Sequence, residues 1–307
     1  MAPERSGPVA VTGATGFIGS ALVDSLRGDG YDVLRLTRGT VDRGAGEIAW
    51  DPATGQIDSE ALTGTRAVVH LAGESLDGRW TDAQKRRIRE SRIAGTRLLA
   101  EALASLPEPP EVLVSGSAVG YYGVDRGDEP LDETSAPGTD FLSRLVVEWE
   151  AAAEPAAGAC VRVVHPRFGM VLDRSGGALA RMLPVFRLGA GGRLGSGRQW
   201  MSWVSREDAV RAIRFLIDTP ALAGPVNVTA PQPVTNAIFT EELGRALRRP
   251  AILVVPGFAL RLAFGEMADA MVLASLKAFP ERLLEAGFEF RHPGIDQAFA
   301  TIIRSDG

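Results

Sequence analysis

A glycine-rich turn near the start of the chain constrains the fold more than any other feature. The stretch Pro8–Ser20 reads PVAVTGATGFIGS, a short apolar strand followed by a GxxGxxG turn and then by an amphipathic run that predicts a helix. Gly13 permits a tight strand-to-helix turn, Gly16 lets a pyrophosphate approach the backbone, and Gly19 lets the helix lie close to the sheet. The helix start also offers its N–H groups to phosphate. Strand, turn and helix in this order predict a dinucleotide-binding site.

Composition narrows the class of protein. The 307 residues are 45% hydrophobic and 23% charged, which indicates a globular chain long enough for a large α/β domain and a smaller lobe. The net charge of −5 argues against a nucleic-acid-binding protein, which needs a basic face. The single cysteine, Cys160, excludes an internal disulfide and falls where a buried strand is predicted. The three histidines are far apart, so no metal site is expected.

The sequence also bears on where the protein acts. No apolar run approaches the length that spans a membrane, and Met1–Arg5 lacks the apolar core of a secretory signal. We therefore expect a cytoplasmic protein that acts on a small molecule, with neither a membrane nor a nucleic acid as its partner.

The end of the second predicted strand indicates which dinucleotide is bound. Tyr31–Arg38 reads as a strand, and in a dinucleotide-binding fold its tip lies beside the adenosine ribose. An acidic side chain there binds the 2′-hydroxyl of NAD, whereas an arginine accepts the 2′-phosphate of NADP. This tip carries Thr37 and Arg38 and no acidic residue, so we expect NADP(H). The alternative is that Arg38 is an ordinary solvated loop residue.

Strand and helix patterns alternate through the first part of the chain. Further strands are predicted at 67–73, 112–117 and 161–166, and helices at 80–105 and 141–153. The alternation predicts an α/β fold with a Rossmann-like, doubly wound parallel sheet, whose ligand crevice lies at the carboxyl ends of the strands. Beyond residue 170 the pattern loosens. We expect a Rossmann domain at 1–230 and a smaller C-terminal α/β substrate lobe at 231–307, to which 170–205 also contribute.

Ordered motifs along the chain resemble the extended short-chain dehydrogenase/reductase superfamily, in particular its sugar-nucleotide-epimerase-like subfamily of unassigned substrate. The motifs are VTGATGFIGS, VVHLAGES, SRIAGTRLLAEAL, SGSAVGYYG, GMVLDRSGGAL and QWMSWVSREDAV. The segment GFALRLAFGEMAD also resembles a small C-terminal domain of that subfamily. The resemblance spans essentially the whole chain. It implies an NADP(H)-dependent oxidoreductase or epimerase, and by analogy a homodimer formed through the long helices.

The resemblance implies a set of cofactor-binding residues. They would hold the pyrophosphate on the glycine-rich turn, the adenosine phosphate at the tip of the second strand, and the rest of the cofactor along the ends of later strands. These residues are Gly13, Thr15, Gly16, Phe17, Ile18, Gly19, Thr37, Arg38, Leu71, Ala72, Gly73, Glu74, Arg92, Arg167 and Val171. Arg92 stands where typical members have an asparagine, so its cation is expected to bind phosphate. Otherwise the basic cluster around it is a solvated helix face.

The catalytic positions depart from the superfamily pattern. In typical members a serine or threonine orients the substrate, a tyrosine exchanges a proton with it, and a lysine four residues later lowers the pKa of that tyrosine. Ser117 fits the first role. Asp140 and Arg144 stand at the tyrosine and lysine positions. Hydride transfer still needs a positioned acid or base, so another group must take that role.

Three interpretations of the catalytic site remain open. In the first, Tyr121 or Tyr122 supplies the proton, and Arg144 or Arg92 helps to stabilise the tyrosinate. In the second, Asp140 or Glu74 is the general base, and the tyrosines only line the pocket. In the third there is no chemistry, and the protein is an NADP(H)-binding sensor or scaffold.

Arginine and tryptophan residues give a faint indication of the substrate. Arg167, Arg193 and Arg198 flank the expected cleft and could bind an anionic substrate such as a nucleotide sugar. Trp200 and Trp203 could stack on a ring of that substrate. The alternative is that all five residues stabilise loops.

Overall fold

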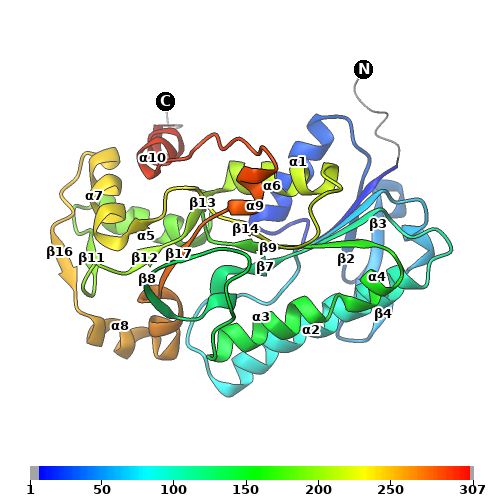
Figure 1. Cartoon of the computed structure of the whole chain (residues 1–307), viewed down its shortest axis with the longest axis horizontal. Helices are drawn as coiled ribbons and strands as arrows, with labels where there is room; N and C mark the ends of the chain where they lie inside the picture. Colours follow the sequence, from blue (N-terminus) through cyan, green and yellow to red (C-terminus); the bar gives the residue numbers. More distant parts are fainter. Residues whose placement is uncertain (1–6, 305–307) are drawn as a thin grey trace.

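The structure is a computed structural model that describes residues 7–304, so the expectation for Met1–Arg5 falls outside the described residues. Its centre is a nine-stranded sheet in the order β14-β9-β6-β5-β1-β2-β3-β4, with β7 paired to β9 (Figure 1). The strands are β1 (Val9–Thr12), β2 (Val33–Thr37), β3 (Glu47–Asp51), β4 (Gln56–Ile57), β5 (Ala67–His70), β6 (Val112–Ser115), β7 (Ser117–Ala118), β9 (Arg162–Phe168) and β14 (Gly224–Val228). Every pair is parallel except β3–β4. The expected Rossmann-like parallel sheet is confirmed.

Helices cover both faces of this sheet, which is why its central strands are continuous apolar runs. All four residues of β1, β5 and β6 are buried. The helices are α1 (Phe17–Gly28) and α6 (Arg206–Asp218) on one face, and α2 (Asp82–Ala104), α3 (Phe141–Ala151) and α4 (Glu154–Gly158) on the other (Figure 1). Within residues 7–304, no helix is long and apolar enough to cross a membrane.

The strand order reverses direction at β1, which has β2 on one side and β5 on the other. The loops that leave β1 and β5 therefore emerge beside each other at the carboxyl edge of the sheet, the place where ligands bind in folds of this kind. The glycine-rich turn is the loop that follows β1.

Two glycines of this turn are required by backbone contacts alone. Gly13 has a φ of +65°, and a Cβ there would lie 2.9 Å from the backbone nitrogen of Ala72. A Cβ on Gly19 would lie 2.1 Å from the carbonyl oxygen of Gly13. Gly16 is less crowded, because its added Cβ would lie 3.1 Å from the same oxygen. The turn thus presses α1 against β1 and leaves the surface at Gly16 open.

The C-terminal part of the chain builds a lobe from small strand pairs and helices. The pairs are β10 (Met170–Leu172) with β13 (Trp203–Ser205), β11 (Gly192–Leu194) with β16 (Leu253–Val255), β12 (Trp200–Met201) with β15 (Val234–Thr235), and β17 (Ser275–Ala278) with β8 (Asp125–Leu131). The helices are α5 (Gly177–Arg187), α7 (Asn236–Leu247), α8 (Gly257–Phe264), the π-helix η4 (Ala268–Val272), α9 (Glu281–Glu285) and α10 (Ile295–Arg304). Three short 3₁₀-helices lie elsewhere in the described chain: η1 (Arg43–Ala45), η2 (Glu60–Leu62) and η3 (Val119–Tyr122).

The C-terminal lobe has its own hydrophobic core, but it also packs into the domain that contains the large sheet. Side chains from 172–203 pack with others from 230–302 in one buried cluster. Two later residues, Leu283 and Phe288, instead belong to the core between the large sheet and α1 and α6. The pairing of β8 with β17 adds a second link between the parts. A single boundary near residue 230 therefore describes the chain only in outline.

The prediction for Cys160 is wrong. Its side chain is exposed, and its φ of +63° puts it in the left-handed region. The apolar segment that suggested a buried strand residue forms β9 only from Arg162 onward. Cys160 lies in the turn between α4 and that strand, where the chain reverses direction.

We predict that Gly19→Ala destabilises the fold and that Gly28→Ala does not. The added methyl group at Gly19 would collide with a backbone oxygen that cannot rotate away, at a cost of about 3 kcal/mol in the free energy of unfolding. Gly28 lies in the same helix with no atom within 4 Å of the added Cβ, so alanine there should stabilise by up to about 1 kcal/mol. Urea unfolding of the two variants measures the difference, and equal stabilities would contradict the packing argument.

Candidate functional site

The start of α1 has the features of an anion-binding position. Gly16 is the N-cap and carries no side chain that could cap the helix. The backbone N–H groups of the first turn, at Phe17 and Ile18, therefore lack a side-chain partner, and the helix dipole adds positive potential there. Thr15 is exposed beside them. This end of α1 can accept a phosphate group without any rearrangement.

A buried hydroxyl fixes the loop that faces the glycine-rich turn. Thr12 Oγ1 accepts hydrogen bonds from the backbone nitrogens of Leu71 (3.1 Å) and Ala72 (3.2 Å). Its own proton therefore points to His70 Nδ1, 2.7 Å away. His70 must carry its ring proton on Nε2, which has no hydrogen-bond partner among the described residues. Burial, with a further contribution from Arg92, lowers the pKa of His70 to about 4, so the ring is neutral.

The tip of β2 has polar groups that are not engaged elsewhere in the described structure. Thr37 ends the strand, and its Oγ1 is buried without a hydrogen-bond partner. Arg38 follows it and is exposed, with no ion pair or hydrogen bond to any residue in 7–304. By contrast, Arg35 in the middle of the strand is paired with Glu47 at 3.0 Å. Arg38 is thus a cation available to a ligand at this tip.

Ser117 lies in a buried ionic network. Its Oγ donates to Glu150 Oε1 at 2.6 Å. Arg167 donates to both oxygens of the same carboxylate, from Nε and Nη2, at 2.8 Å each. Ser117 and Arg167 are neighbours in register on β7 and β9, and Glu150 reaches them from α3. Burial works against the charge on Arg167, but the paired carboxylate outweighs it and holds the pKa of the guanidinium above its usual range.

The two tyrosines have different surroundings. The hydroxyl of Tyr122 donates to Asn227 Oδ1 at 2.7 Å and accepts from Arg167 Nη1 at 3.1 Å. Its side chain is fully buried, and burial raises its pKa to about 12. Tyr121 is partly exposed, and its hydroxyl makes no hydrogen bond to the described residues. The guanidinium of Arg167 stacks on the Tyr121 ring, 3.4 Å from its centroid. Only Tyr121 keeps its hydroxyl free for a ligand.

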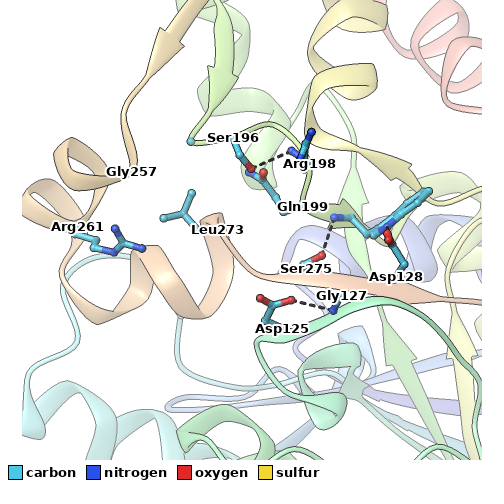
Figure 2. Close-up of a pocket in the computed structure, with 12 residues that line it drawn as sticks. Asp125, Gly127, Asp128, Ser196, Arg198, Gln199, Gly257, Arg261, Leu273 and Ser275 are labelled. Atoms are coloured by element: carbon cyan, nitrogen blue, oxygen red, sulfur yellow. Dashed lines mark hydrogen bonds between the residues drawn. The ribbon is translucent and has the colours of Figure 1, made fainter.

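A cleft of about 580 Å³ opens in the C-terminal lobe (Figure 2). It lies between the start of β8 with Asp125 and Asp128, the loop that carries Arg198, and Arg261 on α8. Trp200 also lines it, with its indole nitrogen donating to Asp128 Oδ1 at 2.6 Å. Polar groups of both charges and an aromatic ring therefore line the same cleft.

Two of the residues considered for the substrate lie elsewhere. Arg193 lines an adjoining hollow of about 460 Å³ together with Arg198. Trp203 is fully buried, and its indole nitrogen donates to the carbonyl oxygen of Gln232 at 3.1 Å. The suggestion that Trp203 stacks on a substrate is therefore wrong, because it is a core residue of the lobe.

Comparison with known proteins decides the family. Residues 9–229 match the NAD dependent epimerase/dehydratase family, and residues 255–302 match a domain of unknown function, DUF1731. The chain belongs to the NAD dependent epimerase/dehydratase family. This confirms the resemblance to extended short-chain dehydrogenases/reductases and to a subfamily with a small C-terminal domain.

Relatives match this chain along nearly its whole length. An epimerase family protein of Mycobacterium bovis is 47% identical over 94% of this chain and 95% of its own. The chloroplastic homolog of epimerase family protein SDR39U1 from Arabidopsis thaliana is 41% identical over 98% of this chain and 88% of its own. The crystal structure of human SDR39U1 with NADPH is 35% identical, covers 96% of this chain and 98% of its own, and superposes with a TM-score of 0.87.

The structure accounts for the atypical residues at the usual tyrosine and lysine positions of the family. Asp140 is the N-cap of α3. Its Oδ1 accepts from the backbone nitrogens of Leu142 (2.8 Å) and Ser143 (3.2 Å), and its Oδ2 accepts from Ser143 Oγ (2.6 Å). Arg144 donates to the carbonyl oxygen of Thr139. Both side chains thus stabilise the start of a helix, which argues against Asp140 as the general base.

Arg92 is partly buried and is held by backbone carbonyl groups. Its Nη1 donates to the carbonyl oxygens of Glu74 (2.9 Å) and Ile88 (3.3 Å), and its guanidinium lies over the Trp149 ring, 5.2 Å from the centroid. Burial lowers its pKa to about 10. A Cβ on Gly73 would lie 3.3 Å from the guanidinium carbon. Arg92 therefore supports the loop beneath the expected cofactor.

Other cations of α2 form ion pairs at the protein surface. Lys85 pairs with Glu266, and Arg89 with Glu148 at 2.6 Å. Glu74, the other candidate base, is 42% exposed and lies 3.8 Å from Arg87. These contacts fit a solvated helix face.

Sequence reasoning missed Glu150 and Asn227, which complete the network around Arg167. A possible signal was polarity in apolar surroundings: Glu150 follows the buried Trp149 on a helix face, and Asn227 interrupts the apolar strand β14. Their partners are distant in sequence, so the pairing itself was not readable.

Val171, another expected cofactor residue, lies on β10. A Cβ on Gly177, just after this strand, would lie close to both the carbonyl oxygen of Val171 and the ring of Phe17. Among the described residues, no group of three or more His, Cys, Asp or Glu side chains could hold a metal ion.

We predict that acidification destabilises the protein partly through His70. Its pKa is about 4 when folded and 6.5 when unfolded, so as the pH falls below 6.5 the unfolded state takes up a proton that the folded state does not. The free energy of unfolding should fall by about 2 kcal/mol from this residue between about pH 7.5 and pH 5. In His70→Asn, Oδ1 can still accept from Thr12 while the titration is removed. Urea unfolding of both proteins across this range should show a shallower pH dependence for the variant, and identical slopes would refute the assignment.

Proposed function

We propose that the protein binds NADP(H) and catalyses hydride transfer at a carbinol or carbonyl carbon of a small or nucleotide-sugar-like substrate. The observation that carries the proposal lies at the carboxyl ends of β7 and β9: Tyr121 stacks on Arg167, and Ser117 is joined to the same arginine through Glu150. In this fold, ligands bind at that edge of the sheet. Family membership and the NADPH held by the human relative support the same cofactor class.

The residues at the carboxyl edge fit an NADP(H) molecule. The uncapped start of α1 would hold the pyrophosphate, with Gly16 leaving room for it. The unpartnered Thr37 hydroxyl and the Arg38 guanidinium would bind the 2′-phosphate. The loop from Leu71 to Glu74 would lie beneath the cofactor. When bound, NADP(H) supplies or accepts the hydride.

Tyr121 is the proton donor in this proposal. In the reducing direction it gives its hydroxyl proton to the substrate oxygen, and the cation of Arg167 stacked on its ring stabilises the tyrosinate that remains. The proton returns when the substrate is oxidised. Ser117 donates to Glu150, so its oxygen is left to accept a hydrogen bond from a substrate hydroxyl. Tyr122 is unsuited to the task, because its buried hydroxyl is already hydrogen bonded on both sides.

The cleft in the C-terminal lobe is the proposed site for the part of the substrate that lies away from the reacting carbon, because neither Ser117 nor Tyr121 lines it. Arg198 could bind an anionic group, and Trp200 could stack on a ring, with the acidic pair Asp125 and Asp128 available to sugar hydroxyls. This combination suits a small anionic molecule or a nucleotide sugar. The expected cytoplasmic location and homodimer stay predictions, and the plant relative is described as chloroplastic.

A second candidate function is a non-catalytic NADP(H) sensor or scaffold. The capping roles of Asp140 and Arg144 favour it, because the residues at the usual tyrosine and lysine positions serve the fold. The two functions share the cofactor site and differ only in turnover.

We predict that the protein binds NADPH more tightly than NADH, and that Arg38→Ala removes the difference. Loss of a charge-assisted contact to the 2′-phosphate should weaken NADPH binding at least about tenfold and leave NADH binding unchanged. Titration against the intrinsic tryptophan fluorescence measures both affinities. Equal affinities in the native protein, or an unchanged NADPH affinity in the variant, would exclude the assigned 2′-phosphate site.

We predict that Tyr121→Phe lowers turnover, whereas Tyr122→Phe lowers stability. Removing the Tyr121 hydroxyl should lower turnover by about a hundredfold or more at unchanged NADPH affinity, because a positioned acid is lost. Removing the Tyr122 hydroxyl should keep turnover and lower the free energy of unfolding by about 1–3 kcal/mol, because Asn227 loses a buried partner.

The assay follows NADPH absorbance with a panel of carbonyl compounds and nucleotide sugars. Tight NADPH binding without turnover on the whole panel would favour the sensor. Turnover that survives in Tyr121→Phe would exclude this tyrosine as the acid.

A further inference from the structure

Phe17, the first residue of α1, is enclosed by a second segment of the chain. The loop from Asp173 to Gly177 joins β10 to α5 and passes over the Phe17 ring. A Cβ on Gly176 would lie 2.5 Å from a ring carbon of Phe17, and one on Gly177 would lie 3.1 Å from another. The two glycines thus let this loop lie directly against the residue that follows the glycine-rich turn.

Arg206 completes this enclosure from another helix. It is the first residue of α6, and its guanidinium lies over the Phe17 ring, 5.3 Å from the centroid. Its Nη2 lies 3.3 Å from Asp173 Oδ1, and both side chains are partly exposed, at 25% and 20%. This cation is therefore next to the first turn of α1 and reachable from solvent.

The alignment of α1 and α6 explains why Arg206 is there. The helices pack against each other, and eight residues further along each of them Arg214 donates to Ser25 Oγ at 2.9 Å. Equal steps along both helices keep Arg206 beside Phe17 and Arg214 beside Ser25, so the helices run parallel with their starts level. The start of α6 therefore faces the same edge of the sheet as the start of α1.

We propose that Arg206 binds the pyrophosphate of the cofactor and exchanges its present partner, Asp173, for that anion. The inference rests on the proposed NADP(H) binding at the start of α1. A pyrophosphate carries two negative charges and offers oxygens that suit the planar guanidinium, whereas Asp173 offers one charge through a single partly exposed contact.

Asp173 would remain supported after losing Arg206. Its Oδ1 also accepts from the backbone nitrogen of Ser175 at 2.8 Å and from Ser175 Oγ at 2.6 Å. The loop that covers Phe17 can thus keep its shape while Arg206 changes partner. Asp173 is then a competitor of the cofactor for Arg206, which gives the two residues opposite effects on binding.

The test measures the dissociation constant of NADPH for Arg206→Ala, Asp173→Asn and the double variant, with the full-length protein. Arg206→Ala should weaken binding about tenfold, whereas Asp173→Asn, which keeps an acceptor for Ser175, should tighten it severalfold. In the double variant Asp173→Asn should add nothing, because the cation for which it competes is gone.

Two controls distinguish a role of Arg206 in pyrophosphate binding from a general loss of stability: a fragment of the cofactor and a substitution of another arginine on α6. Adenosine 2′-monophosphate, which has the 2′-phosphate but neither phosphate of the pyrophosphate, should bind all three variants as it binds the native protein. Arg211→Ala removes an arginine from the same helix that also stacks on a phenylalanine, Phe288, and it should leave NADPH affinity unchanged. Thermal unfolding of each variant confirms that it is folded.

Three outcomes would overturn the inference while the proposed function stands. They are an unchanged NADPH affinity in Arg206→Ala, an equal loss of affinity for the 2′-monophosphate fragment, and weaker NADPH binding in Asp173→Asn. The last result would mean that the ion pair only anchors the loop. If the native protein binds neither NADPH nor the fragment, the proposed function fails and the role of Arg206 fails with it.

Discussion

The contact between the start of α1 and the end of β1 is the constraint on which the rest of the site depends. Only glycine at position 19 lets the helix approach the Gly13 carbonyl oxygen, since a Cβ would come within 2.1 Å of it. This approach leaves the start of the helix uncapped at the carboxyl edge of the sheet. The Thr12 hydroxyl then fixes the neighbouring loop after β5 through two backbone N–H groups. A phosphate-binding surface therefore follows from packing, before any ligand is present.

The second organising interaction is the ion pair between Arg167 and Glu150. It joins β9 to α3, and its partners extend the connection: Ser117 on β7, Tyr122 on η3 and, through that hydroxyl, Asn227 on β14. Asn227 Nδ2 continues it to the carbonyl oxygen of Phe279 in the C-terminal part of the chain. A buried charge pair of this kind is costly to leave incomplete, so each member restrains the others. The network fixes the geometry at the edge where the lobe meets the sheet.

The sequence predicted the features that depend on local pattern. Glycine spacing and apolar runs were sufficient to predict the sheet, the turn and most helices, because neighbouring residues determine the hydrophobic periodicity and the local backbone conformation. It failed for Cys160, which lies in a turn just before β9, and for Trp203, which is a core residue. It also missed Glu150 and Asn227, since their roles arise from partners far away in the chain. Local signals place the cofactor edge, whereas tertiary contacts decide which side chains at that edge remain free.

Contacts within the folded chain also decide which candidate side chains can take part in cofactor binding or proton transfer. Among the arginines and tyrosines that were candidates on charge or proton chemistry alone, five can be divided by the groups that they already bind. Arg92 and Tyr122 are committed to buried partners, and Arg144 to a backbone carbonyl. Arg38 and Tyr121 have no such partner in the described chain, and they stand at opposite ends of the same sheet edge. A cation at one end and a phenol at the other match the two ends of an NADP(H) molecule. In the proposed function the acid is therefore on η3 instead of at the usual tyrosine position, and the cofactor lies along the same sheet edge.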